Sequence, residues 1–283
     1  MARRGLIRSL SLMTAVMTLG VAAFAGSPRI FRVQLASAAQ PSAQPECRAP
    51  ADLVRFMHPL PRTAQRLAAG EPLTVVAIGS SSTAGVGASS PDASYPSRLA
   101  ADLQQLFPRT KVKMINRGVN GEEVRDMLAR FRTEVIDEKP DLVLWQLGTN
   151  AVLRDDPLKP ADSLVRHGIR ELKATGADVV LIDPQFTKQV IAKPEIGGMV
   201  SLLAAEAKAA DVDLFARFAV MRDWHENDGV PFEKFSAADG LHMNDWGYAC
   251  IAQLLSAAIA DVTQRSITSA HATAVVHSTA AAH

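Results

Sequence analysis

Between residues 71 and 262, short apolar runs alternate with amphipathic segments, and this alternation constrains the fold more than any other feature of the sequence. The apolar runs have the length of strands, are rich in β-branched residues, and end in polar or glycine-containing loops, as buried strands do. The segments between them repeat large apolar residues at helical spacing. The predicted strands are 72–78, 111–116, 141–147, 178–183 and 212–215; the predicted helices are 94–107, 122–138, 160–175, 196–210, 217–226 and 245–262.

This order of elements predicts an α/β fold, namely a three-layer α/β/α sandwich around a five-stranded parallel sheet. Strands joined by helix-length crossovers run parallel, and almost continuously apolar strands indicate that helices cover both faces of the sheet. Residues 71–262 are enough to enclose one substantial core. We therefore expect a single domain over this range.

The N-terminal segment reads as a targeting signal. Residues 1–39 contain five arginines and no acid, and residues 10–25 form an uncharged apolar run followed by small residues. This is the pattern of a signal peptide, with cleavage after Ala25 or after residues 38–39. The alternative is an uncleaved membrane anchor, although the run is shorter than the ~20 apolar residues that a span needs. We therefore predict a periplasmic or secreted protein without a membrane span after cleavage.

Charge and aromatic content exclude one large class of partner. The full chain has 30 basic and 29 acidic residues, and its net charge of +1 becomes about −4 when residues 1–39 and their five arginines are removed. Only 5% of the residues are aromatic. Proteins that bind nucleic acid usually carry a basic surface or aromatic stacking platforms, so we expect no nucleic-acid partner.

Segments on either side of the predicted domain lack periodic structure. Residues 40–70 contain several prolines and are predicted to be a linker that wraps the domain, and residues 263–283 are predicted to be a disordered tail. The two cysteines, Cys47 and Cys250, lie near opposite ends of the mature chain. In an oxidising compartment they could form a disulfide, and the alternative is two free thiols.

Four polar motifs follow the predicted strands or precede the last helix. They are Gly79-Ser80-Ser81-Ser82, Asn116-Arg117-Gly118-Val119-Asn120-Gly121, Gly148-Thr149-Asn150 and Asp239-Gly240-Leu241-His242. Because ligands of open α/β sheets bind at the carboxyl ends of the strands, these motifs are expected to share one cleft. The segment from Gly79 to Gly87 could hold phosphate, but it lacks the lysine of a P-loop, and Ser90 stands where a dinucleotide-binding loop has its third glycine. It could instead present a nucleophilic serine.

An aspartate and a histidine three residues apart can lie on one turn. The carboxylate of Asp239 would then accept a hydrogen bond from Nδ1 of His242 and leave Nε2 free to act as a base.

Together the four motifs resemble those of the SGNH hydrolases, or GDSL-type esterases, a family named for blocks carrying Ser, Gly, Asn and His in this order. The resemblance covers about residues 73–260 and implies a flavodoxin-like sheet. It implies that Ser81 is the nucleophile, His242 the base and Asp239 the residue that orients it. It also implies an oxyanion hole formed by the backbone N–H groups of Ser81 and Gly118 and the side-chain amide of Asn150, with no cofactor or metal.

One position departs from this family. Its first block is usually Gly-Asp-Ser, whereas this chain has Gly79-Ser80-Ser81. The departure leaves Ser81 within a run of three serines, so Ser80 and Ser82 stay open as alternative nucleophiles.

The sequence thus predicts an exported serine esterase that works by two-step acyl transfer, with a small-molecule or polysaccharide ester as substrate. Removal of O-acetyl groups from a carbohydrate is the first expectation, and a lipase, lysophospholipase or thioesterase is the second. A non-catalytic carbohydrate-binding protein that keeps the fold is the alternative from another class. The acyl chain length and the oligomeric state are not predicted.

Other polar or aromatic residues are weaker candidates. Four of them could form a metal site or only a solvated loop, namely Asp223, His225, Glu226 and Asp228. Asp183 could line the cleft or cap the turn at Pro184. His167 is expected on the surface or in the core, and Trp145 in the core.

Overall fold

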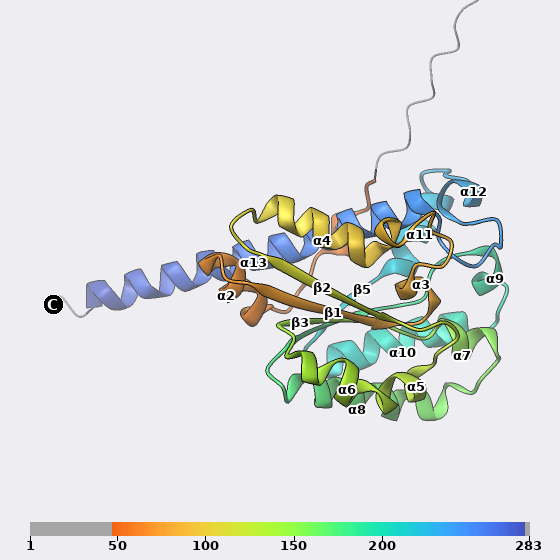
Figure 1. The fold of residues 1–283 in the computed structure, drawn as a ribbon, viewed down its shortest axis with the longest axis horizontal. Helices are drawn as coiled ribbons and strands as arrows, with labels where there is room; N and C mark the ends of the chain where they lie inside the picture. The colour runs from red at the N-terminus through yellow and green to blue at the C-terminus, as the bar shows by residue number, and fades with distance from the viewer. Residues whose placement is uncertain (1–46, 281–283) are drawn as a thin grey trace, which may run out of the picture. The chain divides into compact units, whose positions relative to one another are not determined.

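The computed structural model describes residues 47–280, with side chains through residue 268. Five parallel strands form one sheet in the order β2-β1-β3-β4-β5 (Figure 1). The strands are β1 (Leu73–Gly79), β2 (Val112–Gly118), β3 (Leu142–Gln146), β4 (Asp178–Ile182) and β5 (Asp213–Phe215). The predicted five-stranded parallel sheet is confirmed.

Helices cover both faces of the sheet and complete the three layers (Figure 1). Alternate strand residues face opposite sides: Val75 and Leu144 belong to one hydrophobic cluster, while Val76 and Trp145 belong to the other. The first cluster lies under α2 (Pro61–Ala69), α4 (Tyr95–Leu106), α11 (Arg217–Glu226) and α13 (Asp245–Ala280). The second lies under α5 (Val124–Ala129), α6 (Phe131–Glu134), α8 (Leu158–Lys173) and α10 (Ile196–Ala209).

The helix predicted over 122–138 is broken into shorter pieces. Helix α5 ends at Ala129, α6 begins at Phe131, and a 3₁₀ turn follows at Ile136–Glu138. Arg130 lies between the two helices with non-helical torsions (φ −114°, ψ 4°). The apolar periodicity of this segment was real, because Val124, Met127 and Phe131 are buried, but periodicity alone does not show an interruption at a single residue.

Four one-turn helices toward the carboxyl ends of the strands were not predicted, because they are too short to show a period. Two of them begin the polar loops at the carboxyl ends of β1 and β3: α3 (Ser81–Ala84) and α7 (Thr149–Leu153). The other two are α9 (Lys188–Ile191) and α12 (Phe232–Phe235). All four labels lie toward the same end of the sheet in Figure 1, so the sequence motifs gather at one edge.

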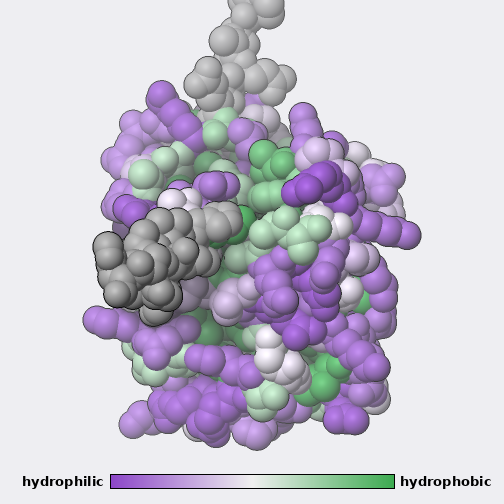
Figure 2. Space-filling model, turned by 90° about the vertical axis from the view of Figure 1, so that its left-hand side faces the viewer, coloured by the Kyte–Doolittle hydropathy of each residue, from purple (hydrophilic) through white to green (hydrophobic). Residues whose placement is uncertain are grey.

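The segment before β1 is more ordered than the predicted linker. It contains α1 (Ala51–Val54) and α2, and Thr63, Ala64 and Leu67 of α2 are buried. Carboxylates at the amino ends of two strands hold it: Asp213 accepts the Met57 N–H (2.7 Å) and Asp178 accepts the Thr63 N–H (2.7 Å). This end of the molecule, seen in Figure 2, has a largely hydrophilic surface with small apolar areas between the polar ones.

The last helix is longer than predicted. Helix α13 continues beyond residue 262, Thr263 is fully buried, and the guanidinium of Arg265 donates to the carbonyl of Phe56 (2.6 Å). The segment predicted to be a disordered tail from residue 263 is therefore helical at its start and packs against the domain there. The disulfide between Cys47 and Cys250 links the N-terminal segment to the same helix. The predicted signal peptide at 1–39 lies outside the described residues.

Candidate active site

Ser81 lies at the point where β1 passes into α3. The strand ends at Gly79, Ser80 has extended torsions, and Ser81 is the first residue of α3. A side chain at Gly79 would collide with the ends of the Thr83 and Gln146 side chains, because a Cβ there would lie 2.2 and 2.7 Å from them. This tight turn leaves Ser81 half-buried, with its Oγ 2.7 Å from Nε2 of His242.

His242 and Asp239 share a turn in the loop before α13. Oδ2 of Asp239 lies 2.6 Å from Nδ1 of His242, and Oδ1 accepts the backbone N–H groups of Leu241 and His242, both at 2.9 Å. A carboxylate accepts from Nδ1 only if Nδ1 carries the proton, which leaves Nε2 to accept from Ser81. The structure therefore brings Ser81, His242 and Asp239 into one hydrogen-bonded chain.

The environment of Asp239 keeps its carboxylate ionised. Partial burial acts to raise the pKa of Asp239, but the hydrogen bonds from the His242 ring and from the two N–H groups together outweigh it and hold the pKa below its usual range. An ionised Asp239 can stabilise the positive charge that His242 acquires when it takes a proton from Ser81.

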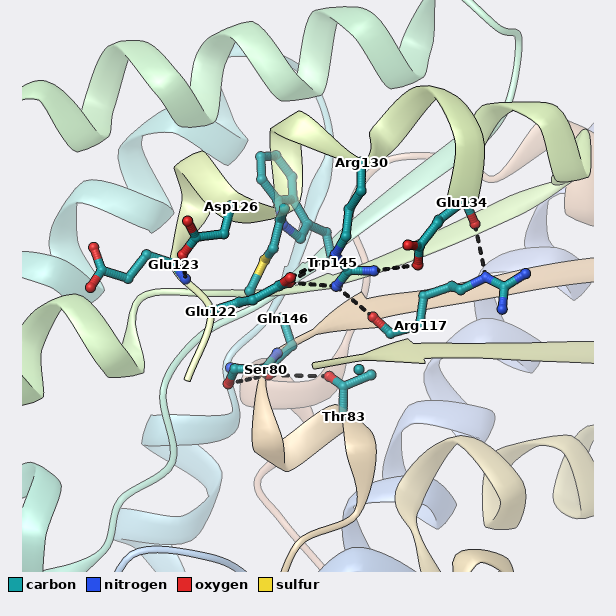
Figure 3. A network of polar contacts seen from close by, with 12 residues as sticks. Ser80, Thr83, Arg117, Glu122, Glu123, Asp126, Arg130, Glu134, Trp145 and Gln146 are labelled. Atoms are coloured by element: carbon teal, nitrogen blue, oxygen red, sulfur yellow. Dashed lines mark hydrogen bonds and ion pairs between the residues drawn. The ribbon is translucent and has the colours of Figure 1, made fainter. Parts of the chain in front are cut away.

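The neighbouring serines face other partners. Gln146 Oε1 accepts from the Ser80 N–H (2.9 Å), the Ser80 hydroxyl (3.1 Å) and the Thr83 hydroxyl (3.1 Å), and Figure 3 shows these three residues joined by dashed lines. The Ser82 hydroxyl donates to Gln185 (3.4 Å). Ser80 and Ser82 are both buried, so among the three serines only Ser81 presents its hydroxyl to His242. Ser80, at the position where a GDSL block has aspartate, thus holds the turn in place.

The predicted oxyanion-hole residues are placed differently from one another. Asn150 lies in the first turn of α7, and its side-chain amide donates one hydrogen to the carbonyl of Glu122 (2.8 Å), which leaves the second amide hydrogen for a ligand. The backbone N–H of Gly118 already donates to Oδ1 of Asn116 (2.9 Å). A Cβ at Gly118 would lie 2.0 Å from the backbone nitrogen of Ala84, so close packing against α3 explains this glycine.

Gly121, three residues further along the same loop, has the properties expected of Gly118. Its φ of 78° lies in the left-handed region that favours glycine, and its N–H has no acceptor among the described residues. Glu122, whose carbonyl binds Asn150, is the next residue. The Gly121 N–H is thus available to a ligand beside Asn150, whereas the N–H of the predicted Gly118 already has an acceptor.

A cavity of about 350 Å³ opens beside Asn150, between α5, α7 and α8. Val124, Leu164 and Met199 supply apolar surface, and Glu123, Asp126 and Asp156 supply carboxylates. A cavity of similar size at the opposite edge of the sheet, bounded by residues such as Leu60, Asp178 and Asp213, contains none of the candidate residues.

A family model described as the Non-GDSL lipase-like family matches residues 46–265. The chain belongs to this family. The GDSL-type label suggested by the four motifs is corrected by this match, and Ser80 is the position at which the first motif departs from a GDSL block.

Relatives of this Non-GDSL lipase-like chain include carbohydrate esterases. An acetylxylan esterase from Geobacillus stearothermophilus is 28% identical over 140 residues, which is 44% of this chain and 64% of that protein. A crystal structure of a catalytic mutant of the same organism's acetylxylan esterase Axe2, in which a serine is replaced by alanine, is 20% identical with a TM-score of 0.57, covering 66% of this chain and 94% of that one. A two-domain esterase active on acetylated mannans is 20% identical with a TM-score of 0.64, covering 74% of this chain but only 54% of that one.

The remaining sequence candidates lie outside the cluster around Ser81. His225 Nδ1 lies 2.9 Å from the carbonyl of Val230, and Asp228 pairs with Arg48 (3.2 Å). Among the side chains described, those of residues 47–268, no three histidine, cysteine or acidic groups are arranged to hold a metal ion. Asp183 is fully buried and accepts the N–H of Phe218 (2.8 Å), while Trp145 is in the core as predicted.

His167 stands on α8, with its side chain 60% exposed, and faces Glu171 one turn along the helix.

Proposed function

We propose that this chain is a serine ester hydrolase of SGNH type that removes acetyl groups from a polysaccharide. The single observation that carries the proposal is the continuous chain from Ser81 Oγ through the His242 ring to Asp239, with contacts of 2.7 and 2.6 Å. A serine hydroxyl becomes a competent nucleophile when a correctly oriented base lies within hydrogen-bond reach.

In the first half-reaction His242 Nε2 takes the Ser81 proton while Oγ attacks the ester carbonyl. The developing oxyanion accepts hydrogen bonds from the Asn150 amide and from the N–H groups of Gly121 and Ser81; as the first residue of α3, Ser81 has no intrahelical acceptor for its N–H. Each such donor typically contributes about 3–4 kcal/mol to transition-state stabilisation. His242 then gives the proton to the alcohol as the bond between the carbonyl carbon and the alcohol oxygen breaks. In the second half-reaction His242 takes a proton from water, the water attacks the acyl-enzyme, and the acid is released as Ser81 regains its proton.

The carbohydrate substrate is supported by the relatives and by the surface near the site. The acetylxylan and acetylmannan esterases act on acetylated polysaccharides, as their names state, although the chain spans only about half to two thirds of two of these relatives. The cavity beside Asn150 combines apolar surface with carboxylates that can bind sugar hydroxyls.

A long-chain lipid ester is less well supported. Val119 and Ile191 are the two large apolar residues that are exposed after β2 and β4, at 42% and 37%, among the described residues. Two separate residues do not form the broad apolar patch that binding to a lipid surface requires. No helix within residues 47–280 is both long and apolar enough to span a bilayer.

We also propose that residues 1–39 direct export. The disulfide between Cys47 and Cys250 supports this proposal, because such bonds persist in oxidising compartments and are rare in the cytosol.

Replacement of each serine in turn tests the proposed function. Ser81→Ala is expected to abolish hydrolysis of 4-nitrophenyl acetate, release of acetate from acetylated xylan, and labelling by a fluorophosphonate. Ser80→Ala and Ser82→Ala are the matched controls, and the fluorophosphonate should still label Ser81 in both. Absence of labelling in the wild-type protein would favour the non-catalytic carbohydrate-binding alternative. Faster turnover of palmitate than acetate esters would favour a lipase.

A further inference from the structure

Arg130, which lies outside the predicted motifs, forms hydrogen bonds at both ends of the loop that contains Gly118 and Gly121. The Nε of Arg130 lies 2.9 Å from each carboxylate oxygen of Glu122, and one terminal nitrogen lies 2.5 Å from Oε2 of the same carboxylate. That terminal nitrogen also donates to the carbonyl of Arg117 (2.7 Å). Figure 3 shows the guanidinium between these two groups, with the second terminal nitrogen held by Glu134 (2.9 Å).

The two groups held by Arg130 are the two ends of the loop 118–121. Arg117 is the residue before Gly118, and Glu122 is the residue after Gly121. The carbonyl of Glu122 also accepts the side-chain amide of Asn150, so the residue that receives the guanidinium also fixes the second donor of the proposed oxyanion hole.

The loop has a second, more exposed arginine contact. Arg154 donates to the carbonyl of Gly121 (2.7 Å), and its side chain is 49% exposed, whereas those of Arg130 and Glu122 are only 12% and 14% exposed. Exposed pairs contribute little because water competes for the same groups. Arg130 is therefore the stronger of the two arginine contacts on the loop, which is also held by the hydrogen bond from the Val119 N–H to the carbonyl of Gly79 (3.0 Å).

We propose that Arg130 is a positioning residue that holds the backbone of loop 118–121 and the amide of Asn150 in the geometry needed to bind the oxyanion. This inference rests on the proposed function. Oxyanion donors are effective because they are already aimed before the reaction, so a loop of glycines and polar residues needs an external constraint. A planar guanidinium can bind a carboxylate and a carbonyl at fixed angles, which a lysine ammonium cannot do.

The local backbone agrees with this role. Arg130 is the residue at which α5 ends and α6 begins, and its non-helical torsions interrupt a segment whose apolar spacing would suit one continuous helix. A nearly buried ion pair is weak evidence for a contribution to stability, since removing both charges from water costs about as much as their attraction returns. Precise placement of the loop is the better physical explanation.

Kinetic constants of Arg130→Gln and Arg130→Lys test the inference. In Arg130→Gln, kcat for 4-nitrophenyl acetate should fall by about 10- to 100-fold while KM changes by less than about twofold, because a donor misplaced by about 1 Å weakens the transition state and not substrate binding. Arg130→Lys should recover only part of this loss. Arg132→Gln is the matched control, since Arg132 is 77% exposed and pairs with an exposed Asp137, and should keep wild-type constants.

Backbone hydrogen exchange supplies a readout that does not need activity. Peptides covering 117–124 should exchange at least about tenfold faster in Arg130→Gln, because local opening of the loop sets their rate, while peptides covering β1 stay unchanged. The double variant Glu122→Gln/Arg130→Gln removes both charges and provides the same measurement if Arg130→Gln folds poorly.

The outcomes separate this inference from the proposed function. Three outcomes would each overturn the positioning role while leaving the proposed esterase activity intact. They are unchanged exchange at 117–124, wild-type kcat in Arg130→Lys, and a fall in kcat that only matches the fall in the fraction of protein labelled by fluorophosphonate. If the wild-type protein hydrolyses no ester and no serine is labelled by fluorophosphonate, the proposed function is overturned, and with it the catalytic role proposed for Arg130.

Discussion

Nδ1 of His242 lies 2.6 Å from Oδ2 of Asp239, yet the two side chains differ in exposure: the histidine is 12% exposed and the aspartate 43%. The ring is thus enclosed by the protein, while the carboxylate that orients it stands at the rim and is held by the N–H groups of its own turn. Water can reach the place where the carboxylate acts, which limits how much a substitution there can cost.

Asp239→Asn should lower kcat for an acetate ester by about 10³-fold, somewhat less than the ~10⁴ seen where the orienting carboxylate is buried. An amide at this position favours the wrong tautomer of His242, with the proton on Nε2 facing Ser81. Steady-state kinetics measure the effect, and Glu233→Gln is the control, because Glu233 is an exposed acid in the adjacent α12 that pairs with Lys188. Loss of activity in Glu233→Gln as well would indicate general damage to this region.

Asn150→Ala should lower kcat by about 10²–10³-fold with little change in KM, as removal of one oxyanion donor does. Asn150→Asp should be worse than Asn150→Ala, since a carboxylate would face both the Glu122 carbonyl and the developing negative charge. Asn227→Ala, which removes an exposed contact with Asp223, should have no effect. Equal kcat values for wild type and Asn150→Ala would remove Asn150 from the mechanism.

The layers of the fold could be predicted because each strand and long helix carries its own periodic signal. Val75 and Val76 face opposite sides of the sheet as their alternation requires. The polar motifs after β1 and β3 could be grouped for a related reason, because topology brings the ends of parallel strands together at one edge. His242 precedes α13 and follows no strand, so it was joined to Ser81 and Asn150 through the resemblance to SGNH hydrolases.

What the sequence did not show depends on contacts between distant residues. Gly118 and Gly121 are equivalent as letters, and only the structure distinguishes them: the Gly118 N–H donates to Asn116, whereas Gly121 has a left-handed φ and an N–H with no acceptor among the described residues. The helix break at Arg130 reflects contacts of its side chain with Arg117 and Glu122. The order of the N-terminal segment depends on carboxylates more than one hundred positions away, which local composition cannot reveal.

Loss of the disulfide between Cys47 and Cys250 should reduce the free energy of unfolding by about 2–5 kcal/mol, because the bond closes a loop of 203 residues and limits the unfolded chain. Urea unfolding of wild type with and without reductant measures it. Cys47→Ser should match the reduced wild type and should not respond further to reductant. Wild-type unfolding curves that coincide with and without reductant would show that the bond adds no stability.

Asp183 should make the protein less stable as the pH rises from about 4 to 7. Burial raises the pKa of Asp183 from 3.8 to about 7, against the opposing effects of the Phe218 N–H and the Arg217 guanidinium. In this range the native state keeps the proton that the unfolded state has lost, so ionisation favours unfolding, by up to about 4 kcal/mol across the range. The stability that protonated Asp183 provides is present at low pH and is lost as the pH approaches 7.

Asp183→Asn removes this titration while keeping the shape of the side chain. Relative to wild type, the variant should therefore gain stability between pH 5 and pH 8, as measured by urea unfolding at each pH. Asp92→Asn, an exposed change in the 3₁₀ turn before α4, is the control and should follow the wild-type profile. A constant difference between Asp183→Asn and wild type across this range would mean that Asp183 is ionised in the native state throughout, with Arg217 as its counter-charge.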